Sequence, residues 1–213
     1  MRVSFLFWDV DTQFDFIYPA GKLYVPGAEA IIPNLQRLTS FAAQHHIPIV
    51  ASTDAHLSTD LEFNQYPAHC LKGTPGQRKV EGTLLPQCFT IPNRKIDLPG
   101  DLGRYPQTIL EKQTVDVFTN PNTEALLSQI GRPEIVVYGV VTEICVDHAA
   151  RGLIRRDFRV HLVEDAVRSL DFERGQATSY FVRQHGGRLL TTSEVLDLCG
   201  STPPDSHVKT SSS

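Results

Sequence analysis

Three side chains in this 213-residue chain have types and positions suited to nucleophilic attack on a carbonyl carbon. Asp11, Lys112 and Cys145 each follow an apolar or β-branched run of the kind that forms buried parallel strands. Because ligands bind beyond the carboxyl ends of such strands, we expect the three side chains to meet at one edge of a sheet. There a thiolate would attack, a carboxylate would move the proton, and an ammonium group would stabilise both anions.

The local pattern around Cys145 gives its thiol a reason to ionise. An apolar strand pattern over 135–141 ends just before it, and helical spacing of apolar residues starts at Val146. Thr142 is predicted to cap that helix, which places Cys145 in the first turn, near unpaired N–H groups and the positive end of the dipole. Backbone N–H groups of Val141 and Cys145 are the expected oxyanion donors. On this stretch alone, a buried core cysteine is an equally good interpretation.

Other side chains compete for these roles. Asp9 alternates with Asp11 along the first strand, and Asp15 is expected to hold its own turn through backbone hydrogen bonds. His148 lies one helical turn beyond Cys145 and would suit a Cys–His pair, although a solvated histidine on the helix surface is the preferred interpretation.

A second group of residues has the composition of a metal site. Asp54 and His56 are two residues apart, so both side chains point the same way from an extended backbone. His69 and one carboxylate, from Asp60 or Glu62, would complete a mixed nitrogen and oxygen set. Such a set suits one divalent ion, Zn²⁺, Mn²⁺ or Fe²⁺, with water in the remaining position.

Composition excludes several classes of protein. A net charge of −4 and a pI near 6.0 give no sign of nucleic-acid binding. No apolar run reaches the length of a membrane span, and four cysteines without CxxC spacing indicate neither a disulfide framework nor a zinc ribbon. We therefore expect a cytoplasmic protein with one domain over residues 1–199, followed by a disordered Ser/Thr/Pro-rich tail over 200–213.

Strand and helix patterns alternate along this domain, which predicts βαβ crossovers and a parallel sheet covered by helices. A Pro/Gly-rich region over 54–105 interrupts the alternation and contains the metal-site residues. The predicted helices cover residues 28–45, 123–130, 146–156 and 172–185. The predicted strands cover residues 3–10, 48–53, 107–111, 135–141, 159–164 and 188–191.

Four motifs together resemble the isochorismatase-like cysteine hydrolases, and within them the nicotinamidases and pyrazinamidases. They are DTQFDF at 11–16, STDAH at 52–56, YPAHCLKGTPG at 66–76 and GVVTEICV at 139–146. The resemblance covers roughly residues 3–194. It implies a three-layer α/β/α fold around a six-stranded parallel sheet. It also implies an Asp11/Lys112/Cys145 triad, and a non-proline cis peptide between Val140 and Val141 beside the oxyanion hole.

The resemblance also assigns the metal site. Asp54, His56 and His69 match the nicotinamidase ligands that hold a metal against the pyridine nitrogen of the substrate, with Glu62 at the third position, where histidine is common. Zinc is the expected ion, and glutamate favours harder metals such as Mn²⁺ as well. The aromatic rings expected to sandwich the substrate ring are those of Phe16 and Tyr66.

These features predict hydrolysis of nicotinamide, or of a close aromatic amide such as pyrazinamide, to the acid and ammonia through a Cys145 thioester. A same-fold amidase acting on a carbamoyl or ureido substrate is the alternative, and it would not need the metal. A non-catalytic metal-binding domain is disfavoured by the retained triad, and isochorismate hydrolysis by the nucleophilic cysteine. Gln113 and segment 93–104 depart from the family pattern and leave the substrate open. Relatives are commonly homo-oligomers.

Overall fold

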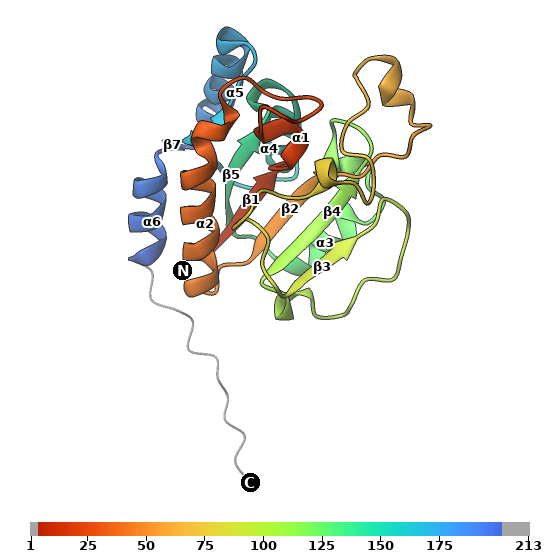
Figure 1. Ribbon diagram of the computed structural model, residues 1–213. Coiled ribbons are helices and arrows are strands. Elements are labelled where there is room, and N and C mark those ends of the chain that lie inside the picture. The colour runs from red at the N-terminus through yellow and green to blue at the C-terminus, as the bar shows by residue number, and fades with distance from the viewer. Residues whose placement is uncertain (1–3, 202–213) are drawn as a thin grey trace.

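The computed structural model describes residues 4–201, which form a seven-stranded sheet in the order β3-β4-β2-β1-β5-β6-β7 (Figure 1). Every neighbouring pair of strands is parallel, as expected from the alternating pattern. The strands are β1 (Phe5–Val10), β2 (Ile49–Asp54), β3 (Cys88–Ile91), β4 (Gln107–Lys112), β5 (Glu134–Val140), β6 (Val160–Arg168) and β7 (Leu189–Leu190).

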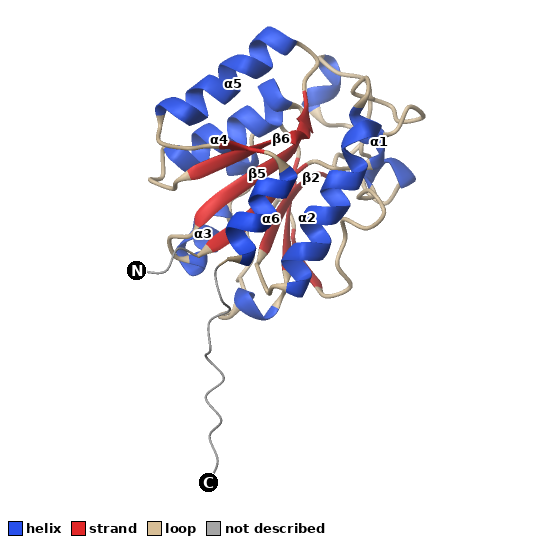
Figure 2. Cartoon of the chain, turned by 90° about the vertical axis from the view of Figure 1, so that its left-hand side faces the viewer, coloured by secondary structure: helices blue, strands red, loops and turns tan. Residues whose placement is uncertain are grey.

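Helices cover both faces of the sheet and make three layers (Figure 2). Helices α2 and α6 contribute apolar side chains to the core on one face, and α3, α4 and α5 contribute to the core on the other. The helices are α1 (Phe14–Ile17), α2 (Ile32–Gln44), α3 (Thr123–Ile130), α4 (Asp147–Ile154), α5 (Phe172–Gln184) and α6 (Thr192–Gly200). The predicted α/β/α architecture is therefore confirmed.

The central strand β1 illustrates why the sheet needs a helical layer on each side. All six of its residues are buried. Phe5 and Phe7 belong to the core beneath α2, whereas Leu6, Trp8 and Val10 belong to the core beneath α4. Because successive strand residues point to opposite faces, an unbroken apolar run is stable only when both faces are covered.

The prediction of six strands is wrong, because β3 (Cys88–Ile91) adds a seventh at the sheet edge. This strand has four residues, pairs only with β4, and lies between Pro86 and Pro92. Three of its four residues are incompletely buried, so it lacks the apolar run by which the other strands were found. Helix α6 was also missed, although Thr191 and Glu194 form the capping box that marks its start.

Other predicted boundaries differ by a few residues. The helix predicted over 28–45 begins as a 3-10 turn, Ala28–Ile31, before α2. Of the tail predicted to be disordered, Gly200 ends α6, and residues 202–213 lie outside the described part of the chain.

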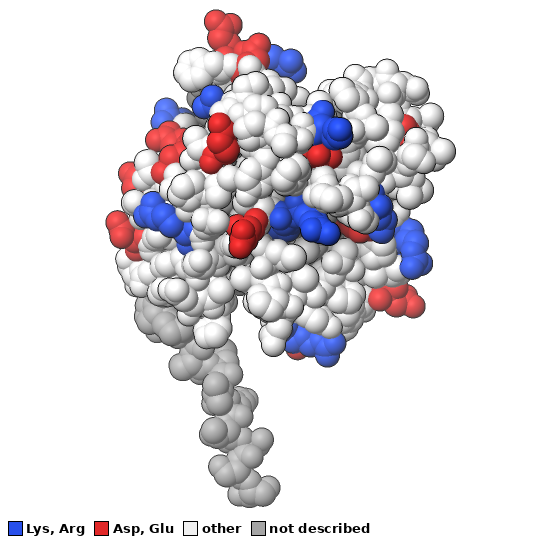
Figure 3. All heavy atoms as spheres, viewed as in Figure 1, with Lys and Arg blue, Asp and Glu red and all other residues white. Residues whose placement is uncertain are grey.

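Acidic and basic side chains are interspersed over the face of the molecule that Figure 3 shows. Within residues 4–201, no helix combines the length and the apolar character that crossing a membrane requires.

Candidate active site

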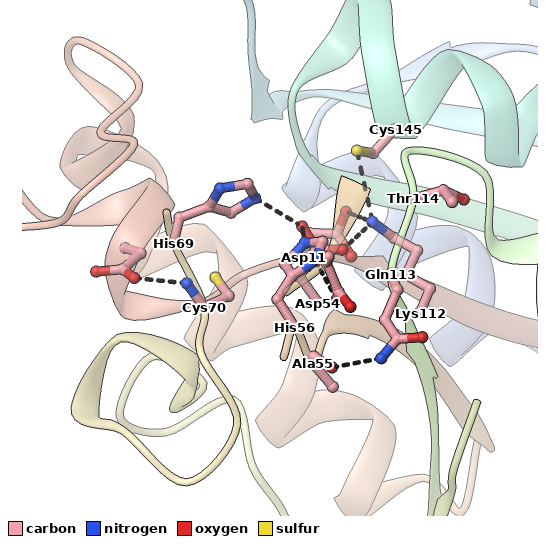
Figure 4. A network of polar contacts seen from close by, with 12 residues as sticks. Asp11, Asp54, Ala55, His56, His69, Cys70, Lys112, Gln113, Thr114 and Cys145 are labelled. Carbon is pink, nitrogen blue, oxygen red and sulfur yellow. Dashed lines mark hydrogen bonds and ion pairs between the residues drawn. The ribbon is translucent and has the colours of Figure 1, made fainter. Parts of the chain in front are cut away.

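The structure brings Asp11, Lys112 and Cys145 together at the carboxyl edge of the sheet (Figure 4). The Nζ atom of Lys112 lies 2.8 Å from Oδ2 of Asp11 and 3.7 Å from Sγ of Cys145. Lys112 ends β4 and Asp11 directly follows β1, while Cys145 lies in the turn that follows β5. The expected meeting of the three side chains is confirmed in geometry, with the lysine between the thiol and the carboxylate.

Asp11 is held rigidly by the neighbouring strand. Its backbone adopts a left-handed conformation, with φ of 51°, and its N–H donates to the carbonyl of Ser52 at 3.1 Å. The Ser52 hydroxyl donates to Oδ1 of Asp11 at 2.7 Å. Oδ1 is thereby fixed by β2, and Oδ2 faces Lys112.

The turn that carries Cys145 differs from the prediction. It is a single π-helical turn, Thr142–Val146, and α4 begins only at Asp147. Thr142 does not cap it: its hydroxyl is buried without a hydrogen-bond partner, and Val141 occupies the capping position. A π-turn placed at the end of a strand is a feature common at functional sites. The cis peptide between Val140 and Val141, implied by the resemblance, is present.

Burial opposes the ionisation of Cys145 that its place at the start of a helix favours. Although the residue keeps some surface exposure, desolvation raises the pKa of its thiol well above the ordinary value. The Lys112 ammonium lowers this pKa, but the charges of Asp11 and Asp54 oppose it. Helix position alone was therefore an incomplete guide, because two buried carboxylates lie near the sulfur. The resting thiol keeps its proton, which must leave during attack.

The acceptor for that proton is adjacent. Burial raises the pKa of Asp11, with the Lys112 ammonium opposing this shift and the Asp54 charge adding to it. Asp11 and Cys145 both border the Lys112 ammonium, and Asp11 is among the groups that raise the pKa of the thiol. Lys112 is itself buried, which lowers its pKa, but the two carboxylates outweigh burial and raise the pKa well above the ordinary lysine value. The lysine therefore remains a cation and Asp11 is the group suited to move a proton.

A candidate metal centre lies beside the triad, where Asp54, His56 and His69 converge. Their ligand atoms all lie within 4.8 Å of one another. Oδ2 of Asp54 is 3.6 Å from Nε2 of His56 and 3.4 Å from Nε2 of His69. Nε2 of His56 is fully buried and has no hydrogen-bond partner. A buried, unpartnered imidazole nitrogen beside a carboxylate and a second imidazole fits a divalent ion such as Zn²⁺.

Asp54 belongs to both groups of residues. Its Oδ1 accepts a hydrogen bond from the Lys112 ammonium, while its Oδ2 faces the two imidazoles. Burial alone would raise the pKa of Asp54, but Lys112, His56 and His69 together hold it far below its usual range. The carboxylate is therefore an anion that joins the triad to the candidate metal centre.

The two candidates for a further carboxylate ligand occupy different places. Asp60 contacts the far side of the His56 ring, with its Oδ2 3.0 Å from Nδ1. Glu62 is half-buried and is not a member of the three-residue cluster. Its pKa is raised, mainly by burial and then by the Asp54 charge, whereas His56 and His69 lower it. Glu62 therefore lies within electrostatic range of the centre, and its assignment as the third-position ligand stays a prediction.

Aromatic rings surround His69. The ring of Phe16 lies 5.3 Å from it and that of Tyr66 lies 6.5 Å from it, so both expected substrate-binding residues border the candidate metal centre. Phe63, which sequence reasoning missed, packs 5.0 Å from His56 and 5.7 Å from His69. The sandwich of Phe16 and Tyr66 around a substrate stays a prediction.

Gln13 is a further residue that sequence reasoning did not single out. Its side chain is completely buried and bonds to both backbone groups of Asp54, accepting from N–H at 2.7 Å and donating to C=O at 2.9 Å. It thereby fixes the strand end that carries the shared carboxylate. A glutamine between Asp11 and Asp15 was the available signal, since a polar side chain beside a buried strand needs partners.

The competing residues have structural partners. Asp9 is buried in an ion pair with Lys79, whose Nζ lies 2.8 Å away. Asp15 accepts hydrogen bonds from the backbone of Lys22 and of Cys70, so it holds two segments and not only its own turn. His148 is exposed, in agreement with the interpretation as a solvated histidine.

The two departures from the family pattern contact each other. Gln113 accepts a hydrogen bond from the Asn93 side chain at 3.1 Å and donates to the carbonyl of Ala55 at 3.4 Å. Asn122 fixes the same segment through the carbonyl of Arg94. Segment 93–104 is therefore attached to the strand end that carries Lys112.

Comparison with known proteins identifies the family of this chain. The Isochorismatase domain family matches residues 6–194. The chain belongs to the isochorismatase family. Enterobactin synthase component B of Escherichia coli is 24% identical over 174 residues, which are 80% of this chain and 55% of that protein. The chain thus spans about half the length of the enterobactin synthase component. A nicotinamidase/pyrazinamidase of Mycobacterium tuberculosis is 28% identical over 163 residues, covering 73% of this chain and 82% of the relative.

Among solved structures, the pyrazinamidase of Pyrococcus horikoshii in complex with zinc is similar to this chain. The two share 25% identity and a TM-score of 0.71, with 88% of this chain and 99% of that chain covered. The family therefore includes nicotinamidases and pyrazinamidases among the relatives of this chain.

Proposed function

We propose that this protein is a metal-assisted cysteine amidohydrolase that converts nicotinamide, or a close aromatic amide such as pyrazinamide, to the carboxylic acid and ammonia. The observation that carries the proposal is the position of Asp54, whose two oxygens face Lys112 of the triad and the two imidazoles. A nucleophile and a metal centre that share one carboxylate can act on the same small substrate. An amide carbonyl one bond from a heteroaromatic ring suits that separation.

The metal would be held by Asp54, His56 and His69, with Glu62 as the candidate additional ligand. Zinc fits this donor set best, with Mn²⁺ or Fe²⁺ as alternatives. When bound, the ion supplies a Lewis-acid anchor for the ring nitrogen of the substrate. Phe16 and Tyr66, beside His69, would enclose the ring from the protein side.

The first half-reaction forms a thioester. The Cys145 sulfur attacks the amide carbon while the thiol proton moves to Asp11, which borders the same Lys112 ammonium as the sulfur. Lys112, 3.7 Å from the sulfur, balances the negative charge that develops there. Backbone N–H groups of Val141 and Cys145 are the proposed donors to the carbonyl oxygen. Asp11 then returns the proton to the nitrogen, the C–N bond breaks, and ammonia leaves.

The second half-reaction releases the acid. Asp11, again a carboxylate, accepts a proton from a water that attacks the thioester carbon. The C–S bond breaks, and the proton returns from Asp11 to the Cys145 sulfur. Lys112 orients Asp11 for this role, because its Nζ lies 2.8 Å from Oδ2.

An amidase acting on a carbamoyl or ureido substrate is the alternative, since it would use the same triad. It would not need Asp54, His56 and His69 to converge, and Nε2 of His56 would then be buried without a partner. The unpartnered imidazole nitrogen therefore favours the aromatic amide.

The test is a screen for ammonia release over nicotinamide, pyrazinamide and carbamoyl compounds, with and without added Zn²⁺. We expect turnover of the aromatic amides that depends on metal and is abolished in a folded Cys145→Ala variant. Full activity of Cys145→Ala would exclude the thioester mechanism. Turnover of carbamoyl compounds alone, indifferent to chelators, would establish the alternative.

A further inference from the structure

The two histidines of the candidate metal centre have different partners on their outer nitrogens. Nδ1 of His56 lies 3.0 Å from Oδ2 of Asp60, and Nδ1 of His69 lies 2.7 Å from the carbonyl oxygen of Pro67. A carboxylate and a carbonyl can only accept a hydrogen bond. Both Nδ1 atoms therefore carry a proton, and the Nε2 atoms, which face Asp54, are the ones available to bind an ion.

The partners of these rings differ in charge. Pro67 offers a neutral carbonyl dipole, whereas Asp60 offers a carboxylate to the completely buried ring of His56. A hydrogen bond from an imidazole to a charged acceptor is stronger than one to a neutral acceptor and raises the basicity of the opposite nitrogen. The two imidazoles are thus unequal as ligands, with His56 the more basic.

The side chain of Asp60 is diverted from the role that its position predicts. Asp60 immediately precedes the 3-10 turn Leu61–Asn64, where an aspartate commonly accepts a hydrogen bond from the turn ahead. Here it makes no such capping bond. Its Oδ2 points back along the chain and accepts from the Leu57 N–H at 2.9 Å as well as facing His56.

We infer that Asp60 is a positioning residue of the metal centre: its carboxylate fixes the tautomer and orientation of His56 and strengthens that ligand without binding the ion. The inference rests on the metal-assisted function proposed above. Outer carboxylates of this kind change metal affinity by about 10- to 100-fold in other sites. Phe63 also packs against His56, with 5.0 Å between ring centres, and restrains the same imidazole.

The experiment measures the Zn²⁺ dissociation constant of the full chain by competition with a chromophoric chelator. Asp60→Asn removes the charge but keeps an oxygen that can accept from Leu57, so the local turn is preserved. We expect a dissociation constant about 10- to 100-fold higher than that of the unaltered protein. Asp97→Asn, which alters an exposed aspartate in another segment, is the matched control and should bind zinc normally.

Metal-free thermal unfolding separates positioning from general damage. The inference predicts that metal-free Asp60→Asn melts within about 2 °C of the metal-free unaltered protein, because asparagine keeps the size of the side chain and an acceptor for the Leu57 N–H. Zinc affinity unchanged within twofold would overturn the inference, as would a loss of affinity matched by loss of metal-free stability. If the unaltered protein itself binds no zinc, the proposed metal-assisted function fails first, and the role of Asp60 fails with it.

Discussion

Asp11 is the residue on which proton movement depends, because it contacts Lys112, whose Nζ also lies 3.7 Å from the Cys145 sulfur. We predict that Asp11→Asn lowers kcat for amide hydrolysis by about 10²- to 10⁴-fold, since the amide cannot accept the thiol proton. Zinc affinity should change little, because Asp11 is not among the three residues whose ligand atoms converge. Steady-state kinetics measure the fall in kcat, and zinc titration measures the metal affinity. A kcat within tenfold of that of the unaltered protein would assign proton transfer to another group.

His161 is a buried titratable group remote from the chemistry. Its Nε2 lies 2.7 Å from Glu134, and its Nδ1 accepts the Arg188 backbone N–H at 3.1 Å. Protonation of Nδ1 would break the second bond. Burial lowers the pKa of His161, and the Glu134 carboxylate only partly opposes this shift.

We therefore predict that stability falls in acid through His161. The unfolded state has the higher histidine pKa, near 6.5, so it binds more protons as the pH drops. This contribution to the free energy of unfolding is fully present above pH 6.5 and is lost as the pH falls toward the lower folded-state pKa. Urea unfolding between pH 7.5 and 5.5 measures it. His161→Gln should show a shallower pH slope, and an unchanged slope would contradict the assignment.

Sequence reasoning was most successful at the residue scale where a side chain ends a strand or lies in the turn that follows it. Asp11, Asp54, Lys112 and Cys145 are such residues, and the sheet brings them together. It was least successful where contacts arise in irregular backbone. The contact of Asp60 with His56 depends on a turn that no apolar periodicity marks, and the raised pKa of Cys145 depends on carboxylates far away in sequence.

At the scale of elements, the end of β5 is the most constrained segment. Gly139 has φ of 117°, and a Cβ atom built there would lie 2.0 Å from the carbonyl oxygen of Val10 in β1. We predict that Gly139→Ala destabilises the protein by about 3 kcal/mol or more, through backbone strain and overlap with a strand that cannot move aside. Activity should also fall, because Val140 and Val141 follow directly.

Gly131 provides the matched control for this prediction. Its φ of 72° is also left-handed, but no atom lies within 4 Å of a Cβ built there. Gly131→Ala should therefore cost only the conformational strain, about 1–2 kcal/mol. Chemical unfolding of both variants makes the comparison, and equal destabilisation would mean that the contact with β1 is unimportant.

At the scale of the whole molecule, alternation of strand and helix was sufficient to predict a parallel sheet with helices on both faces. The apolar runs of β1 and β5 required two covering layers, and the structure provides them. The edge was harder to predict. Strand β3 is short and incompletely buried, so pairing with β4, and not its own sequence pattern, determines that it is a strand.

The candidate metal centre also joins distant parts of the molecule, because Asp54 ends β2 whereas His69 lies in the irregular region after it. An ion bound only by the folded chain adds stability that depends on its concentration. At 100 times the dissociation constant this amounts to about 2.7 kcal/mol, or a rise in Tm of about 5–10 °C for a chain of this size. We therefore predict that chelation lowers the Tm of zinc-loaded protein by that amount.

His69→Ala, which removes one imidazole from the cluster, should melt at the same temperature with and without chelator. Differential scanning calorimetry at fixed pH measures both, and a chelator-insensitive Tm for zinc-saturated, unaltered protein would show that the ion does not link β2 to the segment of His69.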